Sequence, residues 1–202
     1  LAKELNVWLS LGGFQELYIN QDNQERKVSN LHAIVNPNGE ILPENCYRKI
    51  HLFDSPYSNL FESKSTVPGN EIVCVDMGFA KVGLTVCFDL RFPKLFQALR
   101  YGSDTRPCAD IILVPSAFTV PTGRAHWEIL LRARAIETQC MIVAAAQSGQ
   151  HNSKRISYGH SMIVNAWGEI VASCGDELEG YCYAIFDKEE QERIRLGLPV
   201  KD

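Results

Sequence analysis

Three consecutive segments in the middle of the chain constrain its fold more than any other feature. Residues 111–114 (IILV) and 141–146 (MIVAAA) are short apolar runs, and residues 124–139 between them have the spacing of the best helix in the sequence. A strand that is almost wholly apolar is expected inside a sheet covered on both faces. The three segments therefore predict an α/β domain built around a buried sheet.

Two predicted hairpins show that this sheet is not a simple parallel one. Residues 32–35 are followed by the turn Asn36-Pro37-Asn38-Gly39 and a return strand from Ile41, and residues 161–174 turn at 165–168. Turns rich in Asn and Gly between apolar runs are strong hairpin signals. We expect one mixed α/β domain over residues 1–202. The remaining expected elements are strands at 7–11 (closed by Gly12-Gly13), 72–75, 82–86 and 181–186, helices at 92–101 and 188–196, and a polar loop at 52–70.

The composition argues against several classes of protein. Hydrophobic residues make up 46% of the chain and its net charge is −4, so nothing global points to nucleic acid or to an anionic membrane. No apolar run approaches the roughly 18 residues of a membrane span. Seven widely spaced cysteines without a CxxC pair argue against a disulfide framework and a zinc site. Reduced thiols in a cytoplasmic compartment fit best.

The first residues, LAKELNV, have the pattern of a helix that leads into a strand, and they lack an initiator methionine. We therefore expect an N-terminal strand and helix of the domain to be absent from these 202 residues. A targeting peptide cannot be judged from the part given, so a mitochondrial form stays open beside the cytoplasmic one.

Cys87 is the first candidate for chemistry. It stands in VGLTVCFDLRFP, at the carboxyl end of a predicted strand and a few residues before a predicted helix. A thiol there lies near the positive end of a helix dipole and near Arg91, and both favour the thiolate. Because a free cysteine is more often a small buried hydrophobic residue, the functional interpretation needs partners.

Lys49 and Glu128 are the candidate partners. Lys49, in YRKIHLF, has more apolar neighbours than a surface lysine needs, and its ammonium group could stand beside a developing oxyanion. Glu128 shares a helix face with Leu131 and Ala135. It could hold Lys49 in place or form an ordinary surface pair with Arg132 at i+4, and the spacing alone favours neither.

Histidines offer another arrangement, since many cysteine hydrolases use a Cys–His pair. His51, His126 and His160 lie beside aromatic or glycine-containing segments, but the spacing cannot place any of them next to Cys87. We expect these histidines to be structural or to line a pocket.

Together, the motifs resemble the nitrilase superfamily of carbon–nitrogen hydrolases. YRKIHLF is similar to the family's lysine motif, VGLTVCFDLRFP to its cysteine motif and AHWEILLRARAIETQ to its second-glutamate helix, and YGHSMIVNAWGEIVA also matches. LSLGGFQE, PSAFTVPTGRAHWE and ARAIETQCMIVAAAQSGQH resemble most closely the branch that hydrolyses deaminated glutathione. In some invertebrates that branch is fused to a fragile-histidine-triad domain. The resemblance covers nearly the whole chain.

The resemblance implies a role for each candidate residue. Cys87 would attack the amide carbonyl and form a thioester, while Lys49 and the backbone N–H of Phe88 hold the oxyanion. Glu128 would position Lys49. The family's general base is another glutamate on an upstream strand, so we expect the base to lie outside this chain, and Glu16 is not that residue.

The implied fold is an α-β-β-α sandwich of four layers that pairs into a homodimer or a higher oligomer, without a cofactor or metal. The substrate would be a small amide that carries carboxylates. Arg91, Arg124 and His126 lie in or beside the site motifs and are candidates for binding those carboxylates, or are surface and structural groups. Two features depart from the branch: Lys94 replaces an acidic residue, and residues 103–108 look like a short insertion.

Two other functions stay open. An ω-amidase of 2-oxo-amides, in a neighbouring branch, would use the same triad with a different pocket. A catalytically silent binding or scaffold domain would fit the absence of the upstream glutamate, although truncation explains that absence more simply.

Overall fold

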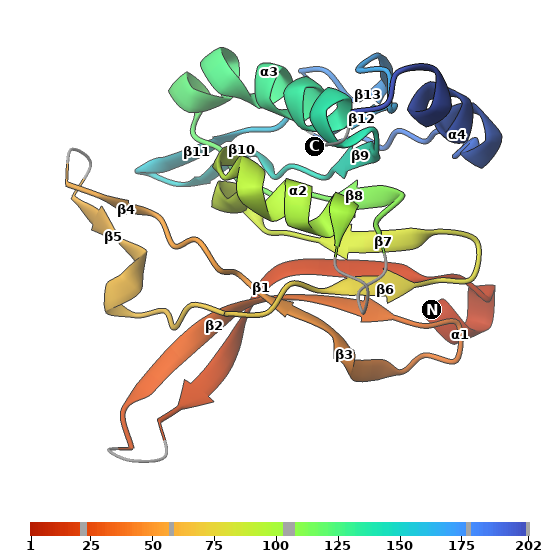
Figure 1. The fold of residues 1–202 in the computed structure, drawn as a ribbon. Helices are drawn as coiled ribbons and strands as arrows, with labels where there is room; N and C mark the ends of the chain where they lie inside the picture. The colour runs from red at the N-terminus through yellow and green to blue at the C-terminus, as the bar shows by residue number, and fades with distance from the viewer. Residues whose placement is uncertain (21–23, 57–58, 103–107, 177–178, 201–202) are drawn as a thin grey trace.

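A six-stranded sheet forms the centre of the computed structural model, which describes residues 1–20, 24–56, 59–102, 108–176 and 179–200 (Figure 1). The sheet has the order β13-β12-β9-β8-β7-β6. Its three central strands are parallel: β7 (Lys81–Leu84), β8 (Ile111–Leu113) and β9 (Met141–Ala144). Its outer strands pair antiparallel: β6 (Cys74–Asp76), β12 (Met162–Val164) and β13 (Ile170–Ser173). The predicted mixture of buried parallel strands and hairpins is confirmed.

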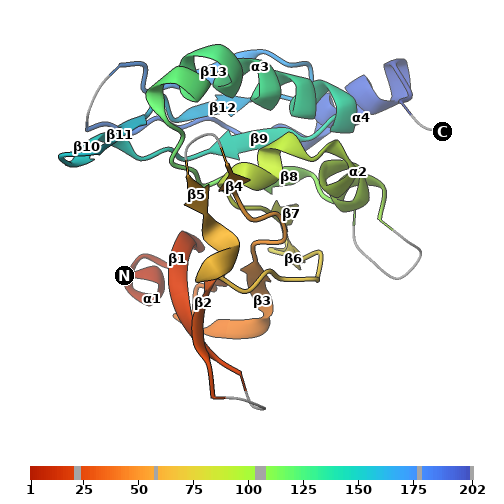
Figure 2. The same cartoon turned by 90° about the vertical axis from the view of Figure 1, so that its left-hand side faces the viewer.

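Helices cover one face of this sheet. The chain crosses from β7 to β8 through α2 (Pro93–Tyr101) and from β8 to β9 through α3 (Val120–Thr138), and these two helices contact each other (Figures 1 and 2). Pro93 occupies the first turn of α2, where its missing N–H costs no hydrogen bond. The last helix, α4 (Lys188–Gly197), is capped at its N-terminus by Asp187, whose side chain accepts a hydrogen bond from the N–H of Glu190. Among the described residues, no helix has the length and apolar character needed to cross a membrane.

A three-stranded antiparallel sheet lies on the other side of the six-stranded sheet (Figure 1). It consists of β1 (Leu9–Ile19), β2 (Arg26–Val35) and β3 (Ile41–Arg48), and the one-turn helix α1 (Ala2–Leu5) leads into it. Asn36 closes the predicted turn between β2 and β3, because its side-chain oxygen accepts hydrogen bonds from the N–H groups of Asn38 and Glu40. Gly39, with a φ of 86°, completes this turn.

The core lies between the helices and the two sheets. The middle strands of the large sheet contribute Leu84, Ile112 and Ile142, which are completely buried, as expected for strands covered on both faces. Large residues from the neighbouring layers complete the same cluster, including Trp127, Leu131, Ile34 and Tyr47. Removing this apolar surface from water is the main force that holds the layers together.

Several predicted elements differ from the observed ones. The glycines at positions 12 and 13 do not end the first strand, because β2 continues to pair with β1 beyond a register shift there. Residues 181–186 are not a strand in the structure, where no described strand pairs with them. The expected insertion at 103–108 lies, except for its last residue, outside the described residues. Six short elements were not predicted: β4 (Asp54–Ser55), β5 (Leu60–Phe61), the 3-10 helices η1 (Glu62–Lys64) and η2 (Cys87–Arg91), β10 (Ser148–Asn152) and β11 (Arg155–Tyr158).

Candidate active site

Cys87 lies in a sharp turn at the carboxyl-terminal edge of the parallel strands. It begins the short 3-10 helix η2 (Cys87–Arg91), which is separated from the end of β7 by Thr85 and Val86, and its backbone has a φ of 49°. Residues other than glycine rarely adopt this left-handed conformation, which costs energy and is often found at functional sites. The N–H of Cys87 donates to the carbonyl of Pro115 at 2.9 Å, which fixes the turn to the segment after β8. The half-buried thiol thus stands where α/β proteins commonly bind their ligands.

Lys49 follows β3 directly, and its side chain is only 4% exposed. The Nζ atom of Lys49 lies 2.6 Å from Oε2 of Glu62, at the start of η1. The same oxygen accepts a hydrogen bond from the N–H of Phe53 at 2.7 Å. A buried ammonium group requires such a carboxylate, because an unpaired charge away from water is very costly.

The structure corrects the expected partner of Lys49. Glu128 is 54% exposed on α3, and its Oε1 atom lies 3.5 Å from Arg132, so it forms the i,i+4 surface pair. The carboxylate that holds Lys49 belongs to Glu62. Sequence reasoning missed Glu62 because it stands in a loop without periodic pattern. One signal could have found it: Lys49 needs a carboxylate, and Asp54 and Glu62 are the acidic residues of the loop that follows.

Asp89 connects the segments of Cys87 and Lys49. Its carboxylate is completely buried, and it accepts hydrogen bonds from the N–H of Val86, next to Cys87, and from the hydroxyl of Tyr47. The N–H of His51 donates to the other carboxylate oxygen. Tyr47 and His51 lie on either side of Lys49, so one carboxylate binds both segments.

The histidines have structural partners. The Nδ1 atom of His51 lies 2.8 Å from Asp89, and its ring stacks on Phe92 with centroids 3.6 Å apart. The ring of His160 stacks on Tyr158 at 3.8 Å, while the carbonyl of His160 accepts a hydrogen bond from the indole of Trp127. These contacts agree with the expected structural roles of His51 and His160.

Two of the three candidates for carboxylate binding lie together. The terminal nitrogens of Arg91 are each 3.3 Å from Nδ1 of His126, and the guanidinium group lies near the rings of Phe88 and Phe118. Burial lowers the pKa of Arg91, and the charge of the Cys87 thiolate opposes this effect. Arg91 is the last residue of η2, the short helix that begins at the candidate nucleophile.

The remaining candidate residues occupy distinct positions. Arg124 is exposed on the first turns of α3. Phe88 belongs to the first turn of η2, whose leading N–H groups have no carbonyl partner within the helix. Glu16 binds Arg48 through both carboxylate oxygens, at 2.7 and 2.9 Å. This ion pair gives Glu16 a structural partner.

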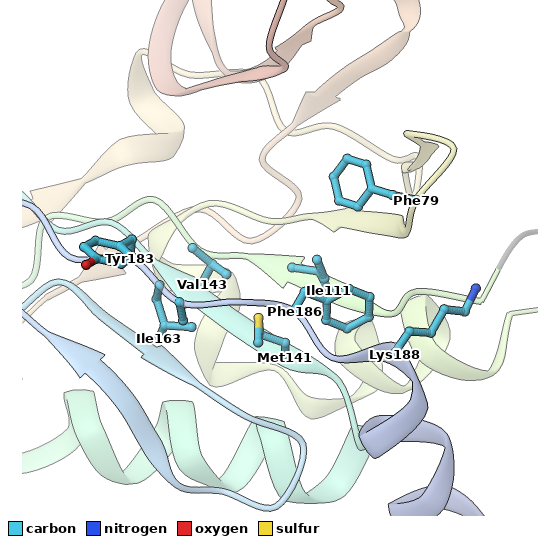
Figure 3. Close-up of a pocket in the computed structure, with 9 residues that line it drawn as sticks. Phe79, Ile111, Met141, Val143, Ile163, Tyr183, Phe186 and Lys188 are labelled. Carbon is cyan, nitrogen blue, oxygen red and sulfur yellow. The ribbon is translucent and has the colours of Figure 1, made fainter.

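A cavity of about 560 Å³ lies away from these residues (Figure 3). Phe79, in the turn before β7, lines it together with Ile111 and Met141, the first residues of β8 and β9. Cys87, in contrast, follows the last residues of β7. The cavity therefore lies toward the opposite ends of the parallel strands and is not the candidate active site.

Residues 1–195 match the family model of carbon-nitrogen hydrolases. The deaminated glutathione amidases of Dictyostelium discoideum and Homo sapiens are 46% and 47% identical over 99% of this chain, which covers 67% and 60% of their lengths. The nitrilase and fragile histidine triad fusion protein NitFhit of Caenorhabditis elegans has a similar structure, with a TM-score of 0.84, 41% identity, and coverage of 98% of this chain and 47% of that one. Saccharomyces cerevisiae Nit3, a member of branch 10 of the nitrilase superfamily, gives a TM-score of 0.81 at 30% identity over 100% of this chain and 67% of that one.

Proposed function

Because the chain belongs to the carbon–nitrogen hydrolase family, we propose that it supplies the cysteine and the lysine of an amidase for a small carboxylate-bearing amide, deaminated glutathione above all. One observation carries the proposal: Cys87 stands in a left-handed turn whose buried Asp89 also binds both flanks of the buried Lys49. The substrate is proposed from the relatives, since two amidases of that substrate are 46% and 47% identical to this chain.

In the proposed reaction the Cys87 thiolate attacks the amide carbon and the C–N bond breaks. A general base takes the thiol proton and returns it to the leaving nitrogen, and water then hydrolyses the thioester. The negative charge that develops on the carbonyl oxygen is stabilised by the ammonium group of Lys49 and the N–H of Phe88. Arg91 and His126 bind a substrate carboxylate beside the thiol.

The test is a Cys87→Ala variant of the full-length enzyme, with Cys46→Ala as a matched control for the loss of a thiol. Turnover of deaminated glutathione should be abolished in Cys87→Ala and unchanged in Cys46→Ala. Iodoacetamide should label Cys87 ahead of the other six cysteines. Turnover by Cys87→Ala would refute the nucleophile.

Steady-state kinetics of the wild-type enzyme on two amides would also separate the alternative functions. We expect a larger kcat/KM for deaminated glutathione than for a 2-oxo-amide. The reverse preference would identify an ω-amidase. Turnover of neither amide, together with a Cys87 thiol no more reactive than Cys46, would identify a silent domain.

We also propose that the chain forms a homodimer through the outer face of α3. Ile129 and Ile136 are 68% and 48% exposed and lie seven residues apart on that face. Trp167, in the turn between β12 and β13, is 57% exposed, and Arg132 binds the neighbouring carbonyl of Gly168 at 2.8 Å. The patch of Ile129, Ile136 and Trp167 supports an interface, because adjoining exposed apolar side chains are typical of protein contacts.

A further inference from the structure

We infer that Asp89 is a positioning residue, which sets the placement of Lys49 relative to Cys87. The inference rests on the proposed function and adds a residue to it. Oδ2 of Asp89 accepts hydrogen bonds from the N–H of Val86 at 2.9 Å and the hydroxyl of Tyr47 at 2.8 Å. Oδ1 accepts one from the N–H of His51 at 3.1 Å, and Nδ1 of His51 lies 2.8 Å away.

These partners lie on both sides of the site. Val86 directly precedes the nucleophile, whereas Tyr47 and His51 are each two residues from Lys49. The hydroxyl of Tyr47 also accepts a hydrogen bond from the N–H of Ile50 at 3.2 Å. The backbone after Lys49 is therefore fixed at both Ile50 and His51. Burial, followed by the charge of Asp89, raises the pKa of Tyr47, and the hydroxyl therefore remains a donor.

Glu62, Asn30 and Arg134 each form hydrogen bonds to only one of the two segments, that of Lys49 or that of Cys87. Glu62 binds the ammonium group of Lys49 and the carbonyl of Asn30 accepts from its N–H at 2.9 Å, but neither residue contacts η2 through a hydrogen bond in the described part of the chain. Arg134 donates to the carbonyl of Leu90 at 3.1 Å and so fixes η2 to α3. Phe53 packs on Phe88 of η2, with ring centroids 5.0 Å apart. In the described part of the chain, Asp89 is the residue whose side-chain hydrogen bonds join η2 to the segment of Lys49.

The chemistry of the four partners explains why this residue is an aspartate. The two backbone N–H groups can only donate, and Nδ1 of His51 donates to a carboxylate oxygen. In Asp89→Asn, the amide NH2 would face the N–H of Val86 or that of His51, whichever way it turned. At least one of the two segments would have to move, although the side chain keeps its size.

The first experiment compares Asp89→Asn with Asp110→Asn in the full-length enzyme. Asp110 is also a buried carboxylate, bound to Arg195 and to the N–H of Lys81, but it stands at the start of β8, away from Cys87. Below the unfolding temperature of both variants, kcat should fall by about a hundredfold in Asp89→Asn, the effect of a displacement near 1 Å. The KM should stay within about threefold because neither acid binds substrate. Asp110→Asn should keep kcat within about threefold.

A double substitution tests whether Asp89 acts through Lys49. In a Lys49→Met enzyme the positioned group is gone, so adding Asp89→Asn should lower kcat by less than about threefold. A full additional hundredfold loss would overturn the inference, because Asp89 would then act independently of Lys49. If Asp89→Asn does not fold, Tyr47→Phe removes one of the four contacts and should lower kcat by about tenfold. Wild-type kcat in Tyr47→Phe would also overturn it.

Failure of the proposed function would look different. Cys87→Ala and Lys49→Met would then retain turnover, whatever the effect of Asp89→Asn. If both lose turnover while Asp89→Asn keeps kcat within about threefold, the positioning role alone is refuted.

Discussion

A single ion pair decides how the lysine of the proposed site is held. Lys49 is almost completely buried, and its ammonium group lies 2.6 Å from Glu62, whose side chain is only 20% exposed. A charge in such a position is stabilised by its partner, and removing one partner of a buried pair costs about 3–5 kcal/mol. The surface pair of Glu128 with Arg132 contributes about 1 kcal/mol at most, because water surrounds both side chains.

Glu62→Gln should therefore lower both stability and activity, because Lys49 loses its counter-charge. We expect kcat/KM to fall by at least about a hundredfold, as for the loss of an oxyanion donor. The matched control, Glu128→Gln, should keep kcat/KM within about twofold. Steady-state kinetics of the two full-length variants check the prediction, and the opposite ranking would restore Glu128 as the residue that positions Lys49.

A buried histidine gives the fold a predictable dependence on pH. His32, in β2, is completely buried, with Nδ1 2.9 Å from the carbonyl of Thr85 and Nε2 2.8 Å from the hydroxyl of Ser10. Burial lowers the pKa of His32 from 6.5 to about 4, although the contact with Thr85 opposes the effect. Thr85 precedes Cys87 by two residues, so His32 links the three-stranded sheet to the segment between β7 and the nucleophile.

The sign of this dependence follows from the lowered pKa. Below pH 6.5 the unfolded chain binds a proton that the folded chain takes up only near pH 4. The free energy of unfolding should be largest above pH 6.5 and should fall by about 3 kcal/mol as the pH drops to 4. Urea unfolding should show a steeper loss for the wild type than for His32→Asn over this range. Parallel pH profiles would show that His32 does not titrate in this way.

At the scale of elements, the local sequence pattern predicted the strands, helices and turns whose contacts are either local or fully apolar. The strands β8 and β9 and the helix α3 between them follow from apolar runs and 3.6-residue spacing, and the Asn36 turn follows from its own side-chain contacts. Residues 181–186 form an apolar run that is typical of a strand, but pairing is a long-range property that no described neighbour supplies. The hairpin of β10 and β11 was missed because its polar residues carry little periodic signal.

The residues of the candidate site also differ in whether a local sequence pattern predicts them. Cys87 was predictable because the end of an apolar strand and the start of a helix are both visible in the sequence. The partners of Lys49 were not, since the loop that brings Glu62 back to Lys49 folds through tertiary contacts without a pattern of its own. The family resemblance pointed to Glu128 instead, and only the geometry separates the two glutamates.

Packing between α3 and β11 gives a prediction at this scale. A Cβ atom at Gly123 would lie 2.2 Å from the ring of Tyr158, so the first turns of α3 can approach β11 only with glycine there. Alanine usually stabilises a helix relative to glycine by about 1 kcal/mol, but Gly123→Ala should destabilise the protein by about 1–3 kcal/mol through overpacking. Gly197→Ala, in α4, has open space around the new atom and should be neutral or stabilising. Thermal unfolding of the two variants checks this, and a stabilised Gly123→Ala would contradict it.

At the scale of the whole molecule, the layers leave two apolar surfaces of different kinds. The cavity beside Phe79 lies over the face of the large sheet that carries no helix, and residues 183, 184 and 186 line it (Figure 3). Ile129 and Ile136 are exposed on α3, which covers the other face of the sheet (Figure 1), and Trp167 is exposed in the turn between β12 and β13. The patch exposes its apolar side chains and can offer them to a partner, which is why we assign the proposed dimer to it.

A charge placed in this patch should separate the proposed dimer. Ile129→Asp puts an unpaired carboxylate at the centre of the interface, where two copies related by twofold symmetry would each bury it. Sedimentation equilibrium of the full-length wild type should give twice the monomer mass, whereas Ile129→Asp should give the monomer mass with an unchanged thermal midpoint, because the side chain is exposed in the single chain. Leu196→Asp, at an 83% exposed position of α4 outside the patch, is the control and should remain dimeric. A monomeric wild type would refute the dimer, and an Ile129→Asp protein that keeps its dimer would place the interface elsewhere.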